Sequence, residues 1–142
     1  MKRACLAAFA IAAFASSAEA VTVANGVVLF NQADALAGNV TPGDAPGFPV
    51  TLSAIGVYRL SGNLLPTAGT DGIDVTAPDV TIDMFGFRLA GAGAALNGIN
   101  GHQRALTVLN GTIRGFTASG ILADSDYLRV SGVCLLYTSR CV

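Results

Sequence analysis

The chain is poor in the residue types that build thiolate metal sites and disulfide frameworks. It holds three cysteines, Cys5, Cys134 and Cys141, and all three lie close to its ends. The segment from residue 21 to residue 133 therefore offers neither a cysteine-based metal site nor a set of disulfides. If the C-terminal segment belongs to the native protein, Cys134 and Cys141 can pair in an oxidising compartment.

Positive charge is also scarce. Residues 21–133 contain five arginines, no lysine and eight aspartates, so aspartate exceeds arginine by three charges. A domain with this balance lacks the basic surface that nucleic-acid binders use to contact phosphates. We therefore expect no nucleic-acid partner.

Catalytic and calcium motifs are missing as well. His102 is the only histidine, and neither a Gly-x-Ser-x-Gly elbow nor a partner cysteine accompanies it, so we expect a solvated turn histidine. Asp71, Asp74, Asp79 and Asp83 lack the spacing and the distal glutamate of a calcium loop. We expect these aspartates in turns and on the outer surface, and we assign no catalytic residue, metal or cofactor.

The N-terminus has the pattern of a secretory signal peptide. A basic start at residues 1–3 precedes an apolar run over residues 5–15, and a small-x-small site ends at Ala20. The apolar run is too short for a mature transmembrane helix, which needs about 20 residues. Residues 1–20 are thus predicted to be a cleaved signal peptide, with an uncleaved anchor as the alternative. The mature protein is expected to be secreted, periplasmic or bound to the cell surface.

The C-terminal segment, residues 134–142, departs from the rest of the chain. It reads Cys-Leu-Leu-Tyr-Thr-Ser-Arg-Cys-Val, and the glycine, threonine and asparagine of the preceding segment become rare. It resembles the translation of a transposase end sequence joined to its inverted copy, a scar of sequencing-library preparation. We interpret it as a non-native tail; the alternative is an ordinary C-terminal extension.

What the chain does contain is a pattern that returns three times, beginning at Gly72, Gly98 and Gly120. Counted from each glycine without gaps, positions +1, +8 and +10 are aliphatic in all three copies. Position +16 is arginine in the first two copies, at Arg88 and Arg114. Short β-rich runs that repeat at this length predict a solenoid of stacked rungs.

Alternation of apolar and polar residues assigns the inner face of each rung. Equal offsets predict stacked columns, with glycine at corners where a Cβ would obstruct the bend. A leucine-rich horseshoe would need a signature that is absent, and a β-sandwich would not explain equal offsets. We predict an all-β, right-handed parallel β-helix of about three recognisable coils over residues 56–133. The predicted columns are Ile73, Ile99 and Ile121; Val80, Leu106 and Leu128; and Ile82, Val108 and Val130.

Residues 21–55 are predicted to lead into this stack. Residues 21–30 alternate weakly, as in one strand, and residues 31–38 read as a short helix with Asn31 as its N-cap and Gly38 at its end. The helix is expected to cap the first rung. Residues 39–49 form a loop rich in proline and glycine, and short strands are expected at residues 50–52 and 57–60.

Two motifs allow a family resemblance to be stated. Gly-Val-Tyr-Arg-Leu-Ser-Gly-Asn-Leu at residues 56–64 and Asn-Gly-Thr-Ile-Arg-Gly-Phe at residues 110–116 resemble bacterial secreted right-handed parallel β-helix repeat proteins of the pectin-lyase-like fold. The resemblance covers about residues 45–133. One departure is Met84-Phe85, where such proteins usually carry Leu-Asn. The resemblance implies a fold but no single activity, because this fold hosts lyases, hydrolases, epimerases and adhesins.

Two groups of residues are candidate ligand sites. The repeat places Asp124 over His102 and Asp126 over Arg104, a polar patch that could hold a sugar or a calcium ion. The alternative is a solvated corner with one weak Asp–Arg pair. Arg88 and Arg114 are expected to stack, which suits an anionic partner such as a uronate polymer; otherwise they splay into water.

These observations predict a secreted scaffold that is surface-associated or binds carbohydrate. Its expected partner is an acidic polysaccharide or a cell-surface glycan, since the resemblance is to proteins that act on such polymers. The alternative is the N-terminal part of a polysaccharide lyase or glycoside hydrolase whose catalytic coils lie in a missing segment. After signal cleavage, we expect no membrane span.

Overall fold

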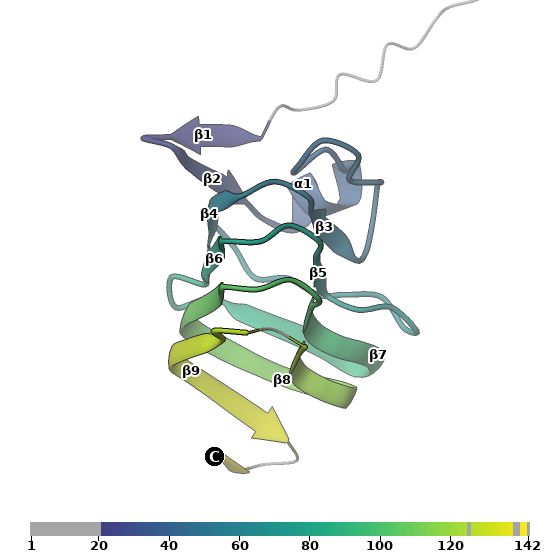
Figure 1. Ribbon diagram of the computed structural model, residues 1–142. Coiled ribbons are helices and arrows are strands. Elements are labelled where there is room, and N and C mark those ends of the chain that lie inside the picture. The colour runs from purple at the N-terminus through teal and green to yellow at the C-terminus, as the bar shows by residue number, and fades with distance from the viewer. Residues whose placement is uncertain (1–20, 125, 138–139, 142) are drawn as a thin grey trace, which may run out of the picture.

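A computed structural model of the chain describes residues 21–124, 126–137 and 140–141. In this structure the backbone forms a parallel β-solenoid of about four turns (Figure 1). Within these residues one continuous sheet contains all ten strands. The elements are β1 (Thr22–Ala24), β2 (Val27–Phe30), α1 (Gln32–Ala37), β3 (Val50–Leu52), β4 (Gly56–Leu60), β5 (Ile73–Val75), β6 (Val80–Asp83), β7 (Arg88–Gly101), β8 (Leu106–Ala123), β9 (Arg129–Tyr137) and β10 (Arg140–Cys141). The all-β solenoid prediction is thereby confirmed.

Parallel pairing between rungs creates three faces, because the long strands β7, β8 and β9 bend around corners. Face A consists of β2, β4, β6 and the first parts of β8 and β9. Face B pairs the first part of β7 with the middle of β8 and the end of β9, and Leu64 bridges to it at Leu89. Face C consists of β3, β5 and the final parts of β7 and β8.

The aliphatic columns run along the inside of the solenoid as predicted, except in the last rung, where Leu128 and Val130 are 42% and 41% exposed. Ile73 pairs with Ile99, which pairs with Ile121, and Val50 extends this column at the N-terminal end. Val50, Ile73 and Ile99 are 0% exposed, so the column is a continuous part of the core. Each such side chain contributes about 1.5–3 kcal/mol through burial. Equal offsets from the three glycines therefore do correspond to physical superposition on this face.

The repeated glycines lie where successive rungs come closest. A Cβ on Gly72 would lie 2.5 Å from the carbonyl oxygen of Gly98, and a Cβ on Gly98 would collide with the carbonyl oxygen of Gly120. Backbone is on the other side of both contacts, so no side-chain rotation can relieve them. This confirms the prediction that a Cβ would obstruct these corners.

A short helix forms near the N-terminus as predicted, with one correction to the segment before it. The Asn31 side chain accepts from the backbone of α1, and Asp34 completes a capping box; α1 lies over the end of the stack with Ala35 buried (Figure 1). The single strand predicted over residues 21–30 is wrong, because β1 and β2 form an antiparallel hairpin. Its turn is Asn25-Gly26, both with positive φ, the combination that two-residue hairpin turns require.

A longer corner between β6 and β7 overturns one further expectation. Asp83 pairs with Leu109, but Arg88 pairs with Thr112, so the upper rung has two more residues than the lower rung between these positions. Arg114 consequently lies beside Ala90. The predicted stacking of Arg88 on Arg114 is therefore wrong, because the extra residues shift the register of face B by two.

At the C-terminal end, β9 continues past residue 133. Cys134, Leu135 and Leu136 pair with residues 112–114 on face B, and Cys134 is disulfide-bonded. The interpretation of residues 134–142 as a non-native tail stays a prediction, and the signal peptide lies outside the described residues. Among the described residues, no helix has the length and apolar character needed to span a bilayer.

Candidate functional site

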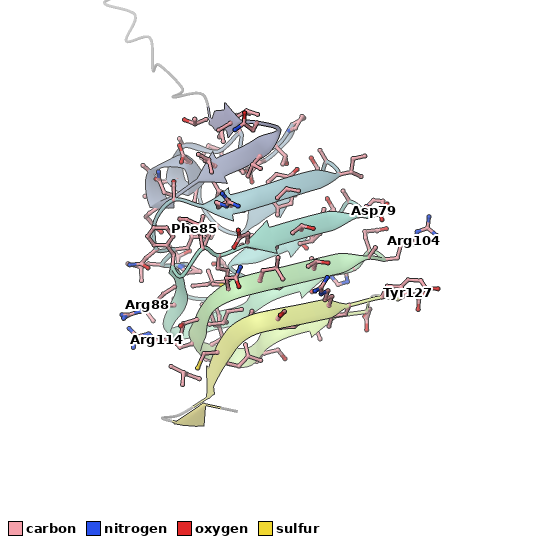
Figure 2. All side chains as sticks on the ribbon, turned by 90° about the vertical axis from the view of Figure 1, so that its left-hand side faces the viewer. Asp79, Phe85, Arg88, Arg104, Arg114 and Tyr127 are labelled. Carbon is pink, nitrogen blue, oxygen red and sulfur yellow. The ribbon has the colours of Figure 1, made fainter. Side chains whose placement is uncertain are left out.

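The four residues of the predicted polar patch lie on one corner, between faces C and A. The backbone N–H of Asp124 donates to the carbonyl of Gly101 at 3.0 Å, and the carbonyl of Asp126 accepts from Ala105 at 2.8 Å. These bonds place the segment with Asp124 and Asp126 directly against the segment with His102 and Arg104. All four side chains are exposed, and Arg104 points away from the solenoid (Figure 2). The corner is open to solvent.

An amide-rich cluster lies next to this corner, on the outer side of face C. Asp71 accepts from the backbone and side-chain N–H groups of Asn97, both at 2.9 Å, and from Asn100 Nδ2 at 2.8 Å. Burial raises the pKa of Asp74; the nearby His102 opposes this rise and Asp71 adds to it. Asp71 thus ties two rungs together. Within the described part of the chain, no group of three or more His, Cys, Asp or Glu residues could hold a metal ion.

A groove of about 460 Å³ runs over face B. Small residues at positions 90–92 form its floor, because a larger side chain would not fit where Gly91 packs against the backbone of Gly115. Leu65 rises on one side, and its backbone is fixed by two hydrogen bonds with Gln32 of the capping helix. The lining residues are Leu65, Ala90, Gly91, Ala92, Arg114, Gly115 and Leu136.

Arg88 and Arg114 both extend from the outer surface of face B. Their neighbours Leu89 and Ile113 are buried, and side chains alternate along a strand, so both arginines point outward. Because Arg88 pairs with Thr112, the two arginines are diagonal neighbours, separated by roughly 7–8 Å with their Cβ atoms somewhat closer. Figure 2 shows both on the same edge of the solenoid. Arg114 lines the groove, and both arginines can reach one extended anion.

The corner between faces A and B carries an ionic cluster that sequence reasoning missed. Arg59 Nε donates to Asp83 Oδ2 at 3.0 Å, while Asp83 Oδ1 accepts from the backbone of Phe85 at 3.0 Å and from Asn110 Nδ2 at 3.2 Å. Burial alone would raise the pKa of Asp83, but these bonds and the charge of Arg59 together hold it below the usual range. Asp83 was expected on the outer surface, yet it is only 7% exposed.

The sequence did contain a signal for this cluster. Arg59 and Asp83 are register partners on β4 and β6, so they carry opposite charges at equivalent positions of successive rungs. The repeat was aligned from Gly72 onward and does not include β4, so that alignment could not pair Arg59 with Asp83. Beside it lies a hollow of about 320 Å³, lined by Leu29, Arg59, Leu60, Ser61, Phe85 and Phe87.

Three comparisons with known proteins find no relative of the chain. No protein-family model, no curated protein and no solved structure matches it. The fold alone defines its class, which is a parallel β-solenoid built from stacked rungs. Because one such fold supports many activities, any function must be argued from the sites described above.

Proposed function

We propose that this protein is a secreted, pectin-lyase-like β-solenoid scaffold that binds an anionic cell-surface polysaccharide along face B. The observation that carries the proposal is the pair Arg88 and Arg114, both exposed on face B, where Arg114 lines a groove of about 460 Å³. The signal-like N-terminus and the family resemblance support the secreted location. Carboxylate groups on a uronate polymer match the planar donor arrangement of arginine.

The geometry of face B suits an extended polymer better than a compact ligand. Its rungs repeat about every 4.8 Å along the solenoid axis, so outward side chains of neighbouring rungs lie in rows across the surface. Two neighbouring guanidinium groups repel each other weakly, and a polyanion lying across both would remove that repulsion. Such binding between exposed charges weakens as salt concentration rises.

A retention experiment tests the proposal. The double variant Arg88→Gln/Arg114→Gln is compared with the wild-type protein on polygalacturonate, alginate and neutral dextran columns, with Arg104→Gln as the matched control. Arg104 is an exposed arginine on the opposite side of the solenoid (Figure 2). We expect the double variant to lose retention on both acidic polymers, and Arg104→Gln to keep it. Equal retention of the double variant and wild type would refute the proposal.

A further inference from the structure

Phe85 is exposed to solvent, and its backbone has a conformation that phenylalanine rarely adopts. Its side chain is 62% exposed, and its φ of 50° lies in the left-handed region. The segment is fixed by the bond from Phe85 N–H to Asp83 and by a 2.7 Å bond from Gly86 N–H to the carbonyl of Asn110. The longer corner between β6 and β7 therefore presents an aromatic ring away from the core. Strained residues of this kind cluster at ligand sites.

A guanidinium group is already in place beside this ring. The Cζ atom of Arg59 lies 4.9 Å from the centroid of the Phe85 ring, and the Arg59 side chain is 38% exposed. Asp83 engages only Nε, so neither Nη group of Arg59 has a hydrogen-bond partner among the residues that the structure describes. Both oxygens of Asp83 accept hydrogen bonds from this corner. The Arg59 side chain is thus fixed by Asp83 while its two Nη groups remain able to donate hydrogen bonds to a ligand.

The adjoining hollow limits what those donors can bind. Its volume is about 320 Å³ and its walls are mostly apolar: Leu29, Leu60, Phe85 and Phe87, with Ser61 and Arg59 as the polar contributors. A neutral ring would leave the Nη groups without an acceptor. A sugar acid would bring its hydroxyl groups against apolar walls, where they lose hydrogen bonds to water. A flat apolar body with one carboxylate satisfies both parts of the site.

We propose that the corner formed by Arg59, Phe85 and Phe87 is a binding site for a small aromatic carboxylate. The carboxylate accepts from the Nη groups of Arg59, and the aromatic ring packs against the two phenylalanines. Charge and apolar surface act together in this recognition. The proposal does not depend on polysaccharide binding, because the residues that line this hollow do not line the groove of face B.

Calorimetric titration of the whole secreted chain with phenylacetate tests this site. The comparison ligands are 2-phenylethanol, which keeps the aromatic ring without the charge, and galacturonate, which keeps the carboxylate on a sugar ring without an aromatic ring. We expect saturable binding of phenylacetate and at least about tenfold weaker binding of both comparison ligands. Equal binding of 2-phenylethanol or galacturonate, or no binding of phenylacetate at millimolar concentration, overturns the proposal.

Two variants separate binding from folding. Arg59→Gln should weaken phenylacetate binding by about tenfold, but it also removes the partner of Asp83. Phe85→Gly removes the ring while suiting the positive φ at this position, so the corner keeps its conformation. We expect Phe85→Gly to fold, to lose phenylacetate binding by at least tenfold, and to leave retention on polygalacturonate unchanged. Wild-type phenylacetate affinity in a folded Phe85→Gly protein refutes the site, whereas Arg104→Gln should bind normally.

Discussion

Substitution of Gly98 by alanine tests the rung stacking on which the whole architecture depends. The added Cβ would collide with the carbonyl oxygen of Gly120, and it would lie 2.7 Å from Ile113 Cγ2. The first obstacle is backbone, so relief requires the rungs to separate and to weaken their hydrogen bonds. We expect the free energy of unfolding to fall by about 3 kcal/mol, the upper end of the usual cost of overpacking. For a domain of this size, that corresponds to a decrease in Tm of about 12 °C.

Gly101→Ala is the matched control on the same strand. Its Cβ would meet Leu106 Cδ2 at 2.6 Å, which is the end of a flexible side chain that can rotate away. We expect a cost of about 1 kcal/mol for this variant. Thermal melts followed by far-UV circular dichroism, with urea unfolding as a second measurement, compare the two proteins. If both variants lose the same stability, or if Gly98→Ala melts within 2 °C of wild type, close stacking at this corner is wrong.

Three further results are expected. Asn31→Ala should lower the free energy of unfolding by about 1 kcal/mol in urea titrations, because it removes the N-cap of α1; an unchanged midpoint would contradict the capping role. Asp83→Asn should lower Tm at pH 7, and the Tm values of variant and wild type should converge in acid. The pKa of Asp83 is lower in the folded protein than in the unfolded chain, so its ionised form stabilises the fold above the unfolded pKa, and this stability is lost as the pH falls through the folded pKa. Asp74→Asn should instead raise Tm at pH 7. Burial raises the pKa of Asp74 in the folded protein, so its ionised form destabilises the fold above that folded pKa. A lower Tm of the variant at pH 7 would refute this.

The interior of the solenoid could be predicted because two physical constraints agree there. Strand side chains alternate, and a slip of one residue would turn an apolar set such as Ile73 and Val75 outward. Stacking then requires the same alternation in the next rung, at Ile99 and its neighbours. A pattern repeated in register has few alternative explanations, so the columns of face C were correctly derived from spacing alone.

The outer surface could not be predicted equally well, because corners tolerate changes in length. The two additional residues before Arg88 do not disturb any inner column, yet they shift the outer neighbours of Arg114. Counting from Gly72 cannot detect such a shift, since the residues before and after it still alternate correctly. The polar corner at His102 was placed correctly because that corner keeps its length: Gly101 pairs with Ala123, and Asp124 bonds to the Gly101 carbonyl.

This contrast indicates where binding sites can be found in a stack of similar rungs. Where the same residue type repeats in every rung, its stacking on the equivalent residues of the two adjacent rungs accounts for its presence. Phe85 does not repeat, because this corner is two residues shorter in the next rung, where Asn110 has the positive φ. The positive φ of Phe85 is held by the bond to Asp83 and by the bond from Gly86 N–H to the carbonyl of Asn110. The exposed ring costs roughly 1.5–3 kcal/mol of burial that a core position would have gained. The exposed ring beside the oriented guanidinium of Arg59 is the feature on which the proposed binding of an aromatic carboxylate rests.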